Sequence, residues 1–308
     1  MSWNLYYMKI VDNEKKLEYE RDFENGELDL IDECNRILGD FNSFCDYYTM
    51  LDSSLNDLKN FLEKAEDFKN KLGSPIKTKN IIVEINKWVI NFVGMFKNFL
   101  DYYEVQVKQV YGEESKEFNE FKNKCSKFYD KYFEYRFLYH LRHFCVHYKL
   151  PVTKISQNIE NNRRIFYMDK DRLKSWSGWK ATIKQDIQKL ENDIDIRQFI
   201  LKIEKILIEL NKDISYYNTP EVLGAIKIMN RYIRAKETPY IVKENNTSDG
   251  KVNFEIKSMI ADYFLANTNI LNLGIISCSV YNKEYGLQIF DPYNLMFTKE
   301  EKEKLGLE

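Results

Sequence analysis

The sequence is poor in proline and histidine and contains no long apolar run. Five prolines divide its 308 residues, and only three histidines occur. No apolar run approaches the ~20 residues that span a bilayer, and the first residues lack the basic and then apolar pattern of a signal peptide. We therefore expect a cytoplasmic protein without membrane segments.

The five cysteines are odd in number and scattered, with no Cys-x-x-Cys pair among them. Structural zinc knuckles are built from such pairs, so the spacing argues against one, and a reducing cytoplasm fits the pattern. The glycine-rich loops that bind nucleotide phosphates or dinucleotides are also missing. We expect no metal and no organic cofactor.

Charge is nearly balanced over the whole chain, at a formal net charge of −2, but it is unevenly distributed. Residues 22–67 contain 13 acidic and 3 basic side chains, whereas residues 122–184 contain 15 basic and 5 acidic ones. A local positive field attracts phosphate even when the total charge is balanced. The alternative is that both stretches are solvated helix faces.

Hydrophobic residues recur at steps of three and four through the first half of the chain, which is typical of amphipathic helices. We expect helices over about 28–72, 78–111 and from 114 into the segment before Pro151. Gly112 is expected to end the second helix and Pro151 the third. Residues 1–151 would then form a long antiparallel helical bundle, in a chain of mainly α class.

After Pro151 the spacing of apolar residues changes to the one typical of short strands flanked by turns. The stretch "VTKISQNIENNRRIFYMD", residues 152–169, predicts a hairpin around Asn161 and Asn162. Further expected elements are helices over about 169–190 (with a break near Gly178), 194–216, 220–235 and 253–267, a linker at 243–251 and a second hairpin around Asn282. Residues 152–242 would thus form a hairpin plus a helical extension, and residues 243–308 a small α+β region.

The stretch "YRFLYHLRHFCVHYKLP", residues 135–151, holds all three histidines, His140, His143 and His147. They share one helix face, but about 10.5 Å of helix rise separates the first from the last, so one ion cannot easily take all three as ligands. A pair could bind a metal with ligands from elsewhere, and each histidine alone could be a hydrogen-bonded core residue. His140 is expected to pack or to orient its neighbours.

A third hypothesis for this stretch is a phosphodiester-cleaving site. Cleavage of RNA by its own 2′-hydroxyl needs a base, an acid and a cation on the phosphate, which histidine and arginine supply near neutral pH. On a straight helix, Arg142 and His147 point about 140° apart. Two copies facing each other across a two-fold axis would bring both pairs into one cleft, so a catalytic motif predicts a homodimer.

The sequence "RHFCVH", residues 142–147, resembles the Arg-(Asn/Asp/His)-x-x-x-His signature of HEPN domains. These are all-α ribonuclease modules of prokaryotic toxins, abortive-infection proteins and RNA-guided effectors, and the resemblance covers at most residues 28–151. It implies that Arg142 and His147 match the invariant pair and that His143 matches the polar residue after the arginine, where asparagine is typical. It also implies that two copies of the motif cleave RNA without a metal.

Other basic residues of this region are expected to bind substrate RNA. They are Arg136, Lys149, Arg163 and Arg164, with Lys170, Arg172 and Lys174 in a surrounding rim. A plain helix face is the alternative for Arg136. Trp176 and Trp179 are expected either to stack on bases or, as tryptophans three apart on a helix, to pack in the core.

Together these patterns predict a metal-independent endoribonuclease that acts on RNA as a homodimer. The resemblance implies a bacterial toxin or an antiphage defence protein, with an antitoxin or another regulatory partner. The alternative is a noncatalytic HEPN-like module that binds RNA or another protein, in which the acidic residues 22–67 meet a basic partner.

Overall fold

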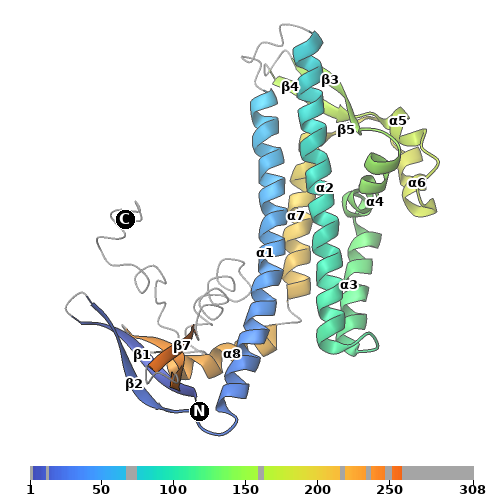
Figure 1. The fold of residues 1–308 in the computed structure, drawn as a ribbon. Helices are drawn as coiled ribbons and strands as arrows, with labels where there is room; N and C mark the ends of the chain where they lie inside the picture. Colours follow the sequence, from blue (N-terminus) through green and yellow to red (C-terminus); the bar gives the residue numbers. More distant parts are fainter. Residues whose placement is uncertain are drawn as a thin grey trace. The chain divides into compact units, whose positions relative to one another are not determined.

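A computed structural model of the chain describes residues 3–11, 14–66, 75–158, 163–215, 219–233, 237–246 and 252–258 (Figure 1). The described residues are mainly helical with small antiparallel sheets, as predicted. They form two compact units, Phe44–Tyr217 and a discontinuous unit of Met1–Ser43 and Asn218–Glu308. These boundaries differ from the three consecutive regions expected from the sequence, because strands that are far apart in the chain pair in one sheet.

The larger unit, Phe44–Tyr217, is built around three helices that lie side by side in Figure 1. They are α1 (Glu27–Glu66, of which residues 44–66 belong to this unit), α2 (Pro75–Tyr111) and α7 (Ile196–Ser215). The leucines of α1 at positions 51, 55, 58 and 62 are all buried, which is the outcome that their helical spacing predicts. Gly112 follows α2 with a positive φ of 90°, so the predicted helix end is confirmed.

The next two helices, α3 (Lys116–Lys131) and α4 (Phe133–His147), are separate, although the sequence predicts one helix here. The chain leaves the helical conformation at Tyr132, with φ −111° and ψ 118°. A helix that ends leaves its last carbonyl groups without partners, and the guanidinium of Arg136 donates to those of Tyr129 and Asp130. The prediction of one helix is therefore wrong, because apolar spacing does not reveal a cap that a side chain provides.

A buried asparagine fixes the chain where it leaves α4. The helix ends before Pro151, as predicted, and the strand β3 (Val152–Asn158) follows. Asn86 on α2 donates to the carbonyl of Val152 at 2.9 Å and accepts from its N–H at 3.0 Å. Neither residue is more than 1% exposed. The path from α4 into the sheet is therefore determined by a side chain of α2.

The strand β3 pairs with β4 (Arg163–Met168) in the predicted antiparallel hairpin, and β4 pairs with the short strand β5 (Ile194–Asp195). Between β4 and β5 lie α5 (Lys170–Lys174) and α6 (Ala181–Gln188). The helix expected over 169–190 is thus interrupted, and the break near Gly178 is confirmed. Trp176 and Trp179 lie in the connecting loop and not on a helix.

The smaller unit contains a four-stranded antiparallel sheet in the order β2-β1-β6-β7. Its elements are β1 (Trp3–Val11), β2 (Glu14–Asp22), the first part of α1, α8 (Thr219–Met229), the 3-10 helix η2 (Asn230–Tyr232), β6 (Thr238–Asn246) and β7 (Val252–Ser258). Glu27, in the first turn of α1, accepts hydrogen bonds from Arg21 and from the hydroxyl of Tyr232. The bond from Arg21, together with that from Tyr232, lowers the pKa of Glu27 to about 2. One carboxylate therefore connects the sheet to the helices of this unit.

The strands of the smaller unit are not among the elements expected from the sequence. The helix expected over 253–267 is wrong for its first part, because residues 252–258 form β7. Val252, Phe254 and Ile256 alternate with polar residues, which is the period of a strand. The expected linker begins inside β6. Residues 259–267, the predicted hairpin around Asn282 and the loop around Asn161 all lie outside the described residues.

We expect Asn86→Ala to lower the free energy of unfolding by about 2–4 kcal/mol, because it leaves the buried N–H and carbonyl of Val152 without partners. Denaturant titration followed by circular dichroism measures the change. Asn91→Ala, at an exposed position of the same helix, is the control and should stay within about 0.5 kcal/mol of the parent. Equal stability of the two variants would contradict the role of Asn86.

Candidate active site

The helix α4 divides its residues between a buried side and an exposed side. The buried residues are Tyr135, Phe137, Leu138, His140, Leu141 and Phe144. Arg142, His143 and His147 lie on the exposed side, together with Val146, which is 62% exposed. Every side chain of "RHFCVH" that matches the HEPN signature is therefore accessible from the surface of this chain.

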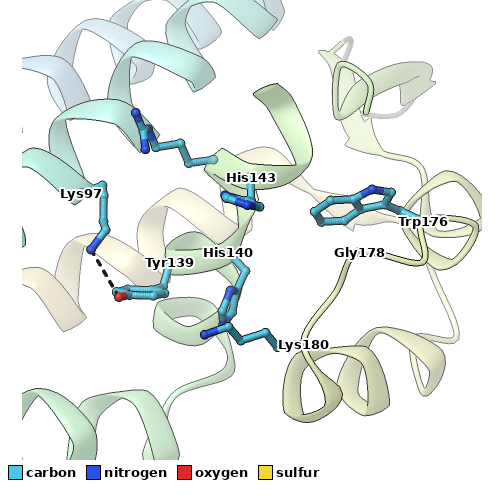
Figure 2. Close-up of a pocket in the computed structure, with 8 residues that line it drawn as sticks. Lys97, Tyr139, His140, His143, Trp176, Gly178 and Lys180 are labelled. Carbon is cyan, nitrogen blue, oxygen red and sulfur yellow. Dashed lines mark hydrogen bonds between the residues drawn. The ribbon is translucent and has the colours of Figure 1, made fainter. Parts of the chain in front are cut away.

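A pocket of about 280 Å³ opens beside these residues (Figure 2) and is named the motif pocket. Its lining residues come from α2, from α4 and from the stretch 175–180 before α6. They are Lys97, Tyr139, His140, Arg142, His143, Trp176, Gly178 and Lys180. Figure 2 shows His143 directed toward the indole ring of Trp176. The pocket therefore combines two residues of the motif with side chains from two other segments.

Positive charge gathers in the motif pocket, and none of its lining residues within the described part of the chain carries a carboxylate. Lys97 is paired with Asp101 and donates to the hydroxyl of Tyr139 at 3.3 Å. Burial lowers the pKa of Lys97, but these two hydrogen bonds outweigh it and hold that pKa above 10.5. Arg142 and Lys180 form no ion pair with any residue that the structure describes. Unpaired cations in a concave site attract anions such as phosphate.

The indole of Trp176 forms one wall of the motif pocket, and Gly178 makes room for it. A Cβ atom on Gly178 would lie 2.4 Å from Cζ2 of Trp176, so the ring occupies the space that a side chain would fill. Trp179 and Phe144 support the ring, with centroids 4.7 and 5.5 Å from it. Trp179 itself is 5% exposed and belongs to the core, whereas the half-buried Trp176 faces the pocket.

His147 lies outside the lining of the motif pocket but contacts it through His143. The two imidazole rings are 4.6 Å apart between centroids, edge to face. Arg142 and His147 project from α4 in different directions, and only Arg142 reaches the pocket. One copy of the chain thus brings Arg142 and His143 together and leaves His147 on the adjoining open surface.

His140 is buried, at 8% exposure, and its Nε2 lies 2.8 Å from the hydroxyl of Tyr129. That hydroxyl also lies 3.2 Å from Oγ1 of Thr182. Burial, and then the neighbouring charge of Lys180, lowers the pKa of His140 to about 4. The ring is therefore neutral at neutral pH, with one donor nitrogen and one acceptor nitrogen.

Two of the four basic residues expected to bind RNA are engaged inside the fold. Arg136 caps α3 and pairs with Asp186 at 2.7 Å, and only 13% of its side chain is exposed. Arg164 is 2% exposed and donates to the carbonyl of Ala65 at 3.2 Å. The expectation of RNA contacts is corrected for both, because their guanidinium groups compensate carbonyls and a carboxylate of the protein itself.

Lys149 and Arg163 are exposed but lie outside the motif pocket. The amine of Lys149 lies 4.8 Å from the ring centroid of Tyr148, and Arg163 pairs with Asn158 at the end of the hairpin away from α4. In the expected rim, Lys170 and Lys174 donate to backbone carbonyls of the segment that follows α6. These residues therefore do not extend the pocket.

Lys97, Tyr139 and Lys180 line the motif pocket but are not among the residues expected from the sequence. Tyr139 lies three residues before Arg142, and the helical period does indicate that they share a side of α4. Lys97 comes from α2, and Lys180 directly precedes α6. No local pattern links these two lysines to the motif, because only tertiary packing brings them there.

Among the described residues, no group of three or more His, Cys, Asp or Glu side chains is placed to hold a metal ion. The same part of the chain contains no helix with an apolar stretch long enough to cross a membrane. Comparisons with protein-family models, curated proteins and solved structures found no match to this chain. The geometry of the pocket and the motif are therefore the grounds for a functional proposal.

The protein is expected to lose stability as the pH falls from about 6.5 to about 4. In this window the unfolded chain, with an ordinary histidine pKa of 6.5, binds a proton at His140 that the folded protein does not bind. The free energy of unfolding then falls by at most ~1.4 kcal/mol per pH unit from this group. His140→Gln keeps a polar partner for Tyr129 without titrating, so we expect its unfolding profile to be flatter over the same range.

Titration of the histidine ring protons by NMR checks the cause directly. Because the chain has only three histidines, His140 is assigned as the signal that the variant lacks. A pKa of His140 at its ordinary value would contradict the burial argument.

Proposed function

We propose that the chain is a metal-independent HEPN-type endoribonuclease that is active as a homodimer. The observation that supports this most is that Arg142 and His143 line one pocket with Lys180 and without a carboxylate. Such a pocket suits a phosphodiester, and the resemblance of "RHFCVH" to the HEPN signature supplies the reaction. On this proposal, the helices α1 to α4 correspond to the HEPN helical bundle.

In the proposed reaction the 2′-hydroxyl of the RNA attacks the adjacent phosphorus, the 5′-oxygen of the next nucleotide leaves, and a 2′,3′-cyclic phosphate forms. A neutral imidazole accepts the proton of the 2′-hydroxyl, and an imidazolium donates a proton to the leaving 5′-oxygen. The two His147 side chains of the dimer provide this pair, and His143 orients the ring of His147 that it contacts. Arg142 binds the nonbridging phosphate oxygens with its planar guanidinium.

The exposed side of α4 suits a second copy of the chain. Val146 lies between Arg142 and His147 in the motif and is 62% exposed, and Leu150, four residues further on, is 41% exposed. Packed against a second copy, these apolar side chains would be removed from water. A two-fold axis here would bring His147 of one copy toward Arg142 of the partner subunit.

The proposed setting follows from the resemblance alone. HEPN ribonucleases with this signature act in toxin systems and in antiphage defence, and we place the chain in such a role in the cytoplasm. An antitoxin or another regulatory partner would then keep the nuclease inactive until RNA cleavage is required.

Substitution of Arg142 or His147 by alanine is expected to reduce RNA cleavage by about 10²–10⁴-fold, because each change removes a group that acts on the reacting phosphate. Both side chains are exposed, so the variants should keep the parent's stability within about 0.5 kcal/mol. His143→Asn is expected to retain most activity, since asparagine is typical at that position of the signature. Initial rates on a long single-stranded RNA in the presence of EDTA give the measurement.

The matched control for these variants is Lys184→Ala, which changes an exposed residue of α6 outside the pocket and should cleave as the parent does. Undiminished cleavage by the Arg142 and His147 variants would rule out the proposed reaction. If the parent binds RNA but cuts none, the noncatalytic HEPN-like module is the better assignment.

We expect Val146→Glu to dissociate the homodimer and to abolish cleavage while the chain stays folded, because it places a charge in the proposed interface without disturbing the core. Sedimentation equilibrium measures the association. Val105→Glu alters a valine of α2 that is 49% exposed, and this control should remain dimeric and active. A parent protein that is monomeric while it cleaves RNA would refute the two-fold site.

A further inference from the structure

A second pocket adjoins the motif pocket and is named the tyrosine pocket. It has a volume of about 250 Å³ and is lined by residues of α3, by residues of α4 and by Lys180. The full lining is Lys122, Cys125, Ser126, Tyr129, Tyr135, Tyr139, His140 and Lys180. Tyr139, His140 and Lys180 also line the motif pocket, so the two cavities share a wall. A ligand in one of them is therefore within reach of the other.

The tyrosine pocket combines aromatic rings with positive charge. Tyr129 and Tyr139 stand edge to face, with ring centroids 6.0 Å apart, and the described residues that line the pocket include no carboxylate. Lys122 is paired with Glu104, whereas Lys180 has no ion pair within the described part of the chain. Proteins hold single-stranded nucleic acid in this way, with bases stacked on aromatic rings and phosphates on cations.

His140 adds a hydrogen-bonding group to the shared wall. Its Nε2 is engaged with the hydroxyl of Tyr129, and its other ring nitrogen forms no hydrogen bond with a described residue. A neutral imidazole nitrogen donates or accepts one hydrogen bond, according to the tautomer. The edge of an unpaired base offers partners of both kinds.

We propose that the tyrosine pocket binds the base of an unpaired nucleotide. The phosphate that joins this nucleotide to the next one lies in the motif pocket. The ring of Tyr139 stacks on one face of this base, Tyr129, which stands edge to face with Tyr139, closes the pocket beside it, His140 contacts its edge, and Lys180 binds the phosphate between the two nucleotides. The inference rests on the proposed function, because it takes RNA as the substrate. It adds a site for the base beside the scissile phosphate, which a base stacked inside a duplex cannot enter.

The test uses the 308-residue chain with His147→Ala, so that the RNA stays intact while binding is measured. The probe is a fluorescein-labelled single-stranded RNA of about 12 nucleotides, with one abasic nucleotide placed at each position in turn, and fluorescence anisotropy gives the affinity. We expect one abasic position to weaken binding by about tenfold, because the stacking of one base is lost there, and the other positions to have little effect.

Two variants locate this effect in the tyrosine pocket. Ser126 is an exposed residue of its lining, and Ser126→Trp should fill the pocket, weaken binding of the intact RNA about tenfold and remove the dependence on the abasic position. Lys180→Ala should weaken binding and reduce the slope of log affinity against log salt by about 0.7. Lys184→Ala, one turn further along α6, should do neither.

The outcomes test the base pocket and the nuclease separately. Affinity that is equal for all abasic positions, or unchanged by Ser126→Trp, overturns the base pocket and leaves the nuclease to be judged by cleavage. A position-dependent affinity in a protein that never cleaves RNA supports the base pocket and refutes the nuclease. No binding of the RNA by the parent or by its His147→Ala variant overturns both.

Discussion

The guanidinium of Arg136 holds the junction on which both pockets depend. It donates to the last carbonyls of α3 and pairs with Asp186 of α6, so three helices meet at one side chain. This cap allows α3 to end at Lys131 and α4 to take a new direction after Tyr132. Along one continuous helix, the residues of the tyrosine pocket would follow a single rod, and no cavity could form between them.

The two arginines of α4 differ in burial and in their partners. Arg136 is almost buried, and a buried guanidinium is stable only when carbonyls or carboxylates surround it, which Tyr129, Asp130 and Asp186 do. Arg142 is exposed and has no ion-pair partner among the described residues. One arginine therefore fixes the helix within the fold, and on the proposed function the other is available to a ligand from outside the chain.

The spacing of apolar residues predicts the helices that bury one apolar side. It does not predict elements whose position or ends depend on tertiary contacts. It gives α1 and α2 because leucines and aromatic residues recur along those helices, and glycine as a helix cap gives the stop at Gly112. It does not give the break at Tyr132, where the side chain of Arg136 caps α3, or the pairing of β1 with β6, which joins strands from distant parts of the chain. β2 is also mostly charged and exposed, so it carries only a weak apolar signal.

Some residues of the candidate site can be predicted from the sequence, and others are brought to it only by tertiary packing. Arg142, His143 and His147 are visible in the sequence because they are neighbours on one helix with a known signature. Lys97 and Lys180 reach the motif pocket from other segments, and their charges resemble those of the many surface lysines around them. Conversely, Arg136 and Arg164 have the charge of RNA contacts, but their burial, which the sequence does not reveal, keeps them from RNA.

The close approach of Trp176 to Gly178 has a consequence for how the motif pocket can change. Because the indole occupies the place that a side chain of residue 178 would take, the ring can keep this position only while residue 178 is a glycine. Even a methyl group at position 178 would push the ring away and alter the width of the cavity while every cation stayed in place. The indole ring thus determines which ligand shapes fit the pocket, and the cations determine its affinity for negative charge. Evolution can change one of these properties without the other.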